Sequence, residues 1–151
     1  MNTRPDDFSA RYDWYEGSLP PPYHYEYSIE ITGDGAGTVE MVPNYPSEDV
    51  PVWTETFTVE LEALDALYRQ LAEHGAFTTR WREEDDPPVG GSHFSTTLTA
   101  NGETVTIPSF VVPDQAAAQG EISAAIVGLV PQDIWDRLES QREQYVEEHS
   151  E

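Results

Sequence analysis

Strict alternation of apolar and polar side chains over residues 23–32 constrains the fold of this chain more than any other feature. The apolar side chains occupy every second position, namely Tyr23, Tyr25, Tyr27, Ile29 and Ile31, and the residues between them are polar or charged. Because successive side chains of a β-strand point to opposite faces, the pattern predicts a strand with one buried and one solvated face. Such a strand is typical of an antiparallel sheet that is covered on one side only.

Two turn signals predict hairpins in the same sheet. A glycine-rich segment, residues 33–37, follows the first strand, and glycine accommodates the positive φ that tight turns need. The dipeptide Asn101-Gly102 lies between two alternating runs and favours a type I′ turn, in which both central residues have positive φ. With two further apolar runs, these signals predict strands over residues 23–32, 38–42, 53–59, 77–82, 93–100 and 103–108.

Apolar residues at helical spacing predict one helix between the third and fourth of these strands, over residues 60–74. The apolar stripe consists of Leu61, Leu64, Leu67, Tyr68 and Leu71. Gly75 is placed to end this helix. Two more helices are predicted over residues 116–130 and from Pro131 onward, because proline is favoured at the first helical position. The fold class is therefore α+β, an antiparallel β-sheet with helices packed on one face and C-terminal helices.

The 151 residues show neither an internal repeat nor a change of composition, so we expect a single domain over residues 1–151. Residues 1–22 are rich in aromatic residues and proline and are predicted to form an N-terminal arm that covers an edge or a face of the sheet. Residues 23–113 would contain the sheet and one helix. Residues 114–151 would form the C-terminal helices.

Charge and composition exclude several classes of function. Acidic residues outnumber basic ones by 29 to 7, the net charge is -22, and lysine and cysteine are absent. We therefore expect no binding to nucleic acid or to an anionic membrane, since both need clustered cations. Disulfides, thiolate metal sites and lysine Schiff bases are excluded. The chain has no apolar run that could span a bilayer and no signal-peptide pattern at its start, so we expect a cytoplasmic location.

Several short motifs have both a functional and a structural interpretation, and we favour the structural one for each. Residues 20–23, Pro-Pro-Pro-Tyr, match a P-P-x-Y ligand of WW domains but also suit an extended, rigid lead-in to the first strand. The acidic run at residues 83–86 could bind a divalent cation or form a solvated loop. The glycine-rich segment is a turn and not a phosphate loop, because a strand follows it and not a helix. We predict no metal site, no cofactor and no catalytic residue.

His24 and Glu26 are the nearest approach to an acid–base pair in the sequence. Two residues apart on the polar face of the first strand, they could work together in catalysis, but the same spacing is common on exposed strand surfaces. We favour the surface interpretation.

Five residues are the candidates for binding, namely Trp14, Tyr15, Tyr23, Arg80 and Arg82. The aromatic ones belong to a group near the N-terminus, and such side chains favour interfaces and ligand clefts. Arg80 and Arg82 flank Trp81, so on a strand both would lie on one face and could hold an anionic ligand. Pairing of these two arginines with nearby acids is the alternative that we favour.

The strand–Gly33-Asp34-Gly35–strand hairpin, the leucine-rich helix, Gly75-x-Phe77 and the later Asn101-Gly102 hairpin follow one another in order. In this order the chain resembles small uncharacterised bacterial proteins, over about residues 23–108. The resemblance implies a similar sheet-plus-helix fold and transfers no catalytic residue.

These observations favour an acidic, non-enzymatic module that binds or interacts with a partner. Its partner would be another protein or a second copy of the chain, contacted through the aromatic N-terminal arm. The alternative is a small-ligand binder or an enzyme that uses glutamate, arginine and histidine chemistry. The acidity also fits a high-salt habitat, or mimicry of the charge of a nucleic acid.

Overall fold

Six strands form one antiparallel sheet in the computed structural model of the chain, which describes residues 3–16, 19–86 and 92–150. Across the sheet the strands follow the order β4-β3-β2-β1-β5-β6, and every neighbouring pair is antiparallel. The strands are β1 (Ser9–Tyr15), β2 (Glu26–Ile31), β3 (Ala36–Val42), β4 (Trp53–Thr58), β5 (His93–Ala100) and β6 (Glu103–Ile107). The chain thus builds the sheet outward from its first strand, with β2, β3 and β4 on one side of β1 and β5 and β6 on the other.

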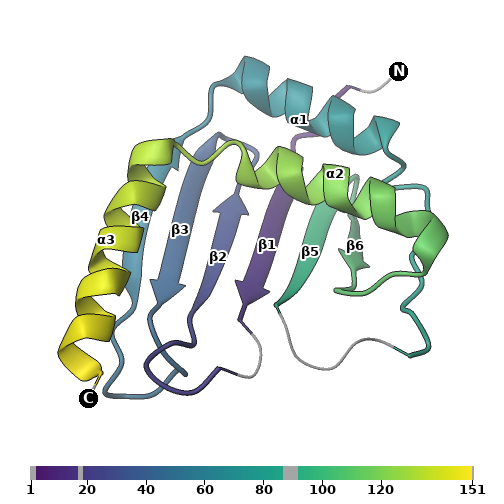
Figure 1. Ribbon diagram of the computed structural model, residues 1–151. Coiled ribbons are helices and arrows are strands. Elements are labelled where there is room, and N and C mark those ends of the chain that lie inside the picture. Colours follow the sequence, from purple (N-terminus) through teal and green to yellow (C-terminus); the bar gives the residue numbers. More distant parts are fainter. Residues whose placement is uncertain (1–2, 17–18, 87–91, 151) are drawn as a thin grey trace.

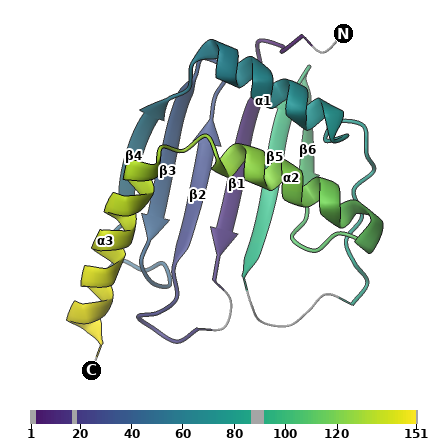
Figure 2. The same cartoon turned by 45° about the horizontal axis from the view of Figure 1, so that its top comes forward.

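Three helices, α1 (Leu61–Glu73), α2 (Ala116–Val127) and α3 (Gln132–His149), lie on the same face of the sheet (Figures 1 and 2). A short 3₁₀ turn, Pro113–Gln115, leads into α2. This arrangement confirms the predicted α+β fold with helices on one face and C-terminal helices. Among the described residues, no helix combines the length and the apolar character needed to cross a membrane.

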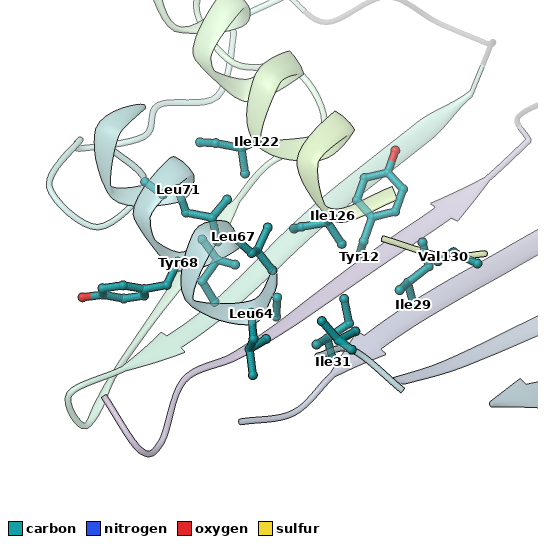
Figure 3. Close-up of a cluster of buried hydrophobic side chains, with 14 of the residues drawn as sticks. Tyr12, Ile29, Ile31, Leu64, Leu67, Tyr68, Leu71, Ile122, Ile126 and Val130 are labelled. Atoms are coloured by element: carbon teal, nitrogen blue, oxygen red, sulfur yellow. The ribbon is translucent and has the colours of Figure 1, made fainter. Parts of the chain in front are cut away.

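The core lies between the sheet and the helices (Figure 3). Ile29 and Ile31 of β2 are fully buried beneath α1 and α2, which contribute large apolar side chains from the other side. The helix contribution comes from Leu64, Leu67, Leu71, Ile122 and Ile126, each no more than 2% exposed. Burying each such side chain stabilises the fold by about 1.5–3 kcal/mol. The predicted leucine stripe on residues 60–74 is therefore confirmed as the buried face of α1.

Residues 9–15 correct the prediction of an N-terminal arm. They form β1, which pairs with β2 on one side and β5 on the other, so they lie in the middle of the sheet and cover neither an edge nor a face. The alternation that defines this strand, with Ala10 and Tyr12 buried and Arg11 and Asp13 partly exposed, is present in the sequence. Its second partner, β5, begins at His93, far along the chain, and local sequence does not reveal such a partner.

The predicted turns are confirmed, but one predicted strand is wrong. Asn101 and Gly102 have φ values of 55° and 76°, as a type I′ turn requires. Residues 77–82 form turns and irregular structure in place of a strand. The local cause is hydrogen bonding, because Trp81 Nε1–H donates to the Ala76 carbonyl and draws the chain back to the end of α1. Only Glu83, just beyond this segment, forms an isolated bridge, to Val111.

Candidate functional site

The face of the sheet opposite the helices carries mainly polar side chains. Threonine recurs on it, as at positions 54, 56 and 58 of β4, where all three side chains are exposed, and at positions 97 and 99 of β5. Both cartoon views place every helix on the other side (Figures 1 and 2). We call this surface the open face. It is accessible to solvent, as expected for the polar side of an antiparallel sheet.

Large apolar side chains that are exposed gather at one end of the molecule. The end is formed by the loops between β1 and β2 and between β3 and β4, and it lies opposite α1 (Figure 1). The described residues include six exposed large hydrophobic side chains, and five of them belong to this end, where they are between 39% and 56% exposed; they are Tyr15, Leu19, Tyr23, Tyr45 and Val52. We call these five the loop-end patch. The sixth residue, Leu61, begins α1 at the other end.

A buried histidine holds the two loops together beneath this patch. His24 is only 2% exposed and its ring stacks on that of Tyr45, with 3.8 Å between ring centroids and 6° between planes. The Tyr45 hydroxyl donates to the Leu19 carbonyl at 2.6 Å. His24 Nε2 lies 2.8 Å from a carboxylate oxygen of Glu26. These contacts fix Leu19 and Tyr45 in position although both side chains are exposed.

The pairing of His24 with Glu26 is present, but its setting differs from the one expected. His24 precedes β2 and is buried under Tyr45, whereas the sequence placed it on an exposed strand face. Its Nδ1 atom is buried and has no hydrogen-bond partner among the described residues. Because Tyr45 covers the imidazole, this ring is poorly placed to meet a substrate. The geometry suits a role for His24 in positioning the two loops.

A cavity of about 450 Å³ opens on the open face next to the loop-end patch. Its apolar walls come from Tyr15, Val42 and Val52, and its charged lining from Arg11, Asp13, Glu26 and Glu40. Arg11 is engaged by Asp13, with 3.0 Å between nitrogen and oxygen, and by Glu30 at 3.5 Å. The hydrogen bond that the Arg11 guanidinium donates to the Asp13 carboxylate is the main cause that raises the pKa of Arg11. The cavity thus combines an apolar wall with a net negative lining.

Trp14, one of the predicted binding residues, faces the helices and belongs to an aromatic cluster between the sheet and α3. Its ring stacks on Tyr27 at 5.0 Å, and Tyr27 meets Trp135 of α3 edge-on at 5.1 Å. Arg142 of α3 lies over the Tyr25 ring at 4.2 Å. Burial raises the pKa of Tyr27 above its ordinary value. Trp14 therefore packs α3 onto the sheet, while its neighbour Tyr15 points to the open face.

Arg80 and Arg82 do not share a strand face, because the segment that carries them is irregular. Their backbone is held by Gln115, whose side chain donates to the Arg80 carbonyl at 2.8 Å and accepts from the Arg82 N–H at 2.9 Å. Both side chains are exposed, and within residues 3–16, 19–86 and 92–150 neither forms an ion pair. The expected pairing with nearby acids is thus not observed. The structure places the two arginines beside the start of α2, away from the loop-end patch.

The remaining motifs acquire simple structural roles. Residues 20–23 form a turn closed by a hydrogen bond from the Tyr23 N–H to the Pro20 carbonyl at 2.9 Å. The prediction of an extended backbone is therefore wrong for this segment. In the described part of the chain, no three histidine, aspartate or glutamate side chains, those of residues 83–86 included, are grouped to hold a metal ion. Gly35, with a φ of 90°, lies in the β2–β3 turn as predicted.

Leu19, Tyr45 and Val52 were not among the residues singled out from the sequence. Leu19 and Tyr45 are single apolar residues in polar, proline-containing loops, and Val52 lies between Pro51 and the start of β4, so only the fold brings the three to one end of the sheet. Comparison with known proteins adds no assignment, since neither a protein-family model nor a curated protein matches the chain.

Proposed function

We propose that this chain is a non-enzymatic interaction module that binds another protein through the loop-end patch. The observation that carries the proposal is the gathering at one end of the sheet of five of the six large hydrophobic residues that are exposed in the described part of the chain. Single exposed apolar residues need no explanation, but a group of them marks interaction sites. Three of the five are tyrosines, which are enriched in interfaces because they are rigid and amphipathic.

Charge supports a basic partner. The net charge is -22, so the field of the whole chain attracts cationic surfaces and repels acidic ones, a second copy of itself included. Next to the apolar wall of the open-face cavity, the carboxylates of Glu26 and Glu40 supply complementary charge at short range. Electrostatic complementarity of this kind raises the rate of encounter and suppresses wrong partners.

The test is affinity capture from a lysate of the source organism at low ionic strength, followed by a salt step. The double variant Leu19→Ser, Val52→Ser removes two apolar side chains of the patch, and Leu61→Ser is the matched control at the other end. We expect a stoichiometric partner on the wild-type chain and the control, released by salt and absent from the double variant. Identical sets of captured proteins on all three chains would refute the proposal.

The open-face cavity favours a second candidate function, the binding of a small cationic ligand. Glu26 and Glu40 converge on it, and carboxylates beside an apolar wall suit such a ligand. Arg11, which also lines the cavity, is paired with Asp13 and Glu30. A thermal-shift screen of metabolites and metal ions addresses this alternative. A hit that Glu40→Gln abolishes and Glu103→Gln leaves intact would favour it over the interaction module.

A further inference from the structure

Strand β4 forms one edge of the sheet and has an unoccupied side. It pairs only with β3, and in the described residues no other backbone hydrogen bond reaches Trp53–Thr58. An edge strand presents unpaired N–H and C=O groups, which form a template for one more strand. In both cartoon views α3 runs along this edge, on the helix side of β4 (Figures 1 and 2).

Two cavities follow one another between β4 and α3. One, of about 340 Å³, includes Trp53 in its lining, and the other, of about 460 Å³, includes Glu55. Gln141 of α3 lines both cavities, so they are adjacent. Trp53 and Glu55 are two residues apart, a spacing of about 6.6 Å along a strand. A strand added to β4 has the same repeat, so two of its alternate side chains would enter the two cavities.

The chemistry of the first cavity selects a cationic side chain. Its walls are aromatic, since Trp53 meets Tyr145 edge-on at 6.3 Å and Tyr145 stacks on His149 at 4.0 Å. The carboxylates of Asp49 and Glu148 belong to the lining as well, and in the described residues neither forms an ion pair. Glu148 accepts one hydrogen bond, from the side-chain amide of Gln144 at 3.0 Å. Aromatic faces and carboxylates together hold the stem and the charge of a lysine or arginine.

The position of this cavity on α3 strengthens the preference for a cation. The lining runs from Gln141 to His149, which is the last residue of the helix. The C-terminal end of a helix carries a partial negative charge from its unpaired carbonyl groups. This charge adds to those of Asp49 and Glu148, whereas an acidic side chain would meet repulsion from all three.

We propose that the groove between β4 and α3 binds an extended basic segment of a partner protein, which adds to β4 as a seventh strand and places a lysine or arginine between Trp53 and Tyr145. Backbone pairing supplies affinity, and the cavity supplies the choice of side chain. The inference rests on the proposed function, because it names the kind of segment that the interaction module takes. It places the helix-facing side chains of that segment against Pro51 and Trp53, adjoining the loop-end patch.

The first experiment uses fluorescent heptapeptides of alternating threonine and valine with arginine at the centre, measured by fluorescence anisotropy. One comparison peptide has glutamate at the centre, and another keeps arginine but has N-methylated amides that cannot pair with a strand. We expect the arginine peptide to bind at least tenfold more tightly than either. Equal binding of the glutamate peptide would overturn the choice of a cation, and equal binding of the N-methylated peptide would overturn strand addition.

The second experiment uses the double variant Asp49→Asn, Glu148→Gln, which removes both carboxylates of the cavity. Its matched control, Asp114→Asn, Glu143→Gln, changes the net charge equally at exposed positions outside the groove. We expect the first pair to weaken binding of the arginine peptide at least tenfold and the control to change it less than twofold. If both double variants lose the same affinity for the arginine peptide, the effect comes from net charge alone and the assigned site is wrong.

The results separate failure of this inference from failure of the proposed function. If no peptide binds while lysate capture still depends on Leu19 and Val52, the groove is wrong and the loop-end module stands. If the peptides behave as expected while the loop-end variant captures every protein that the wild type does, the groove stands and the patch is the wrong contact surface.

Discussion

At the scale of single residues, Asp7 ties the segment before β1 to the β5–β6 hairpin. Its two carboxylate oxygens accept hydrogen bonds from the N–H groups of Asn101, at 2.8 Å, and Gly102, at 2.7 Å. Both donors lie in the type I′ turn between β5 and β6. The bond from Gly102 is the main cause that lowers the pKa of Asp7 below its ordinary value of 3.8, and the bond from Asn101 adds to it.

Replacement of Asp7 by asparagine should lower the melting temperature by a few degrees, because an amide keeps one acceptor and turns a donor toward the other N–H group. The loss should depend on pH. A carboxyl whose pKa is lowered in the folded state stabilises the fold above its unfolded pKa, and this contribution disappears as pH falls through the folded value. Melting curves of both chains should differ fully above about pH 5 and converge below the folded pKa. A difference that is constant with pH would contradict this role.

His24 is the residue on which the loop end depends. Replacement by alanine should cost about 2–4 kcal/mol of unfolding free energy, because it leaves a cavity beneath Tyr45 and removes the stacked ring. Tyr45→Phe keeps the stacked ring and loses only the hydroxyl bond to Leu19, so it should cost about 1 kcal/mol. Urea denaturation measures both values. Equal costs would show that the stacked pair does not organise the loops.

At the scale of elements, replacing a glycine by alanine should have opposite effects on stability at the end of α1 and inside α2. Gly75 follows this helix with a φ of 76°, and an added Cβ would lie 2.7 Å from Thr79 Oγ1. Gly75→Ala should therefore destabilise the chain by about 1–2 kcal/mol. Gly120 lies inside α2, and an added Cβ would meet no atom within 4 Å. Gly120→Ala should stabilise it by about 0.5–1 kcal/mol, and thermal or urea unfolding that gives the same sign for both would contradict this account.

The elements that could be predicted from the sequence are those specified by neighbours along the chain. The period of 3.6 in α1, the alternation in β2 and the Asn101-Gly102 turn are all local, and each element is present. The predicted strand over residues 23–32 is shorter in the structure: β2 begins at Glu26, and Tyr23 lies in the preceding turn with its side chain exposed. The central position of β1 depends on pairing with β5, a distant segment. Its seven residues contain the right alternation, but alternation specifies a strand and not its partners.

The candidate site could be predicted only in part, for the same reason. Tyr15 and Tyr23 were identified from their chemistry and do lie in the loop-end patch. Trp14 has the same chemistry as Tyr15, but the alternation of β1 turns it inward to Tyr27. Tyr45 and Val52 come from another loop, which approaches the first only because β2, β3 and β4 lie side by side. The site is therefore a consequence of the sheet order.

At the scale of the whole molecule, most acidic side chains of the described residues form no ion pair. Four of the seven arginines, at positions 4, 11, 137 and 142, form ion pairs with carboxylates in the described residues. The 29 acidic residues far exceed what these arginines can neutralise. Even Arg137, which bonds both Glu55 and Asp133, lies on the surface, where such pairs contribute little. Repulsion among carboxylates is thus the main electrostatic term that opposes the compact state.

Salt should act on stability and on binding in opposite directions. Raising sodium chloride from about 0.02 M to about 0.5 M shortens the Debye length from more than 20 Å to less than 5 Å, so it screens repulsion between surface carboxylates. We expect the melting temperature to rise by at least about 4 °C, where 1 kcal/mol corresponds to about 2–4 °C for a chain of this size. The same change should weaken capture of the basic partner, because attraction is screened as well. Differential scanning fluorimetry and a binding titration in matched buffers measure the two effects. A melting temperature that falls with salt would show that repulsion among carboxylates does not limit the stability of the fold, and it would remove the high-salt explanation of the acidity. A binding affinity that does not change with salt would show that the net charge has no role in recognition of the partner.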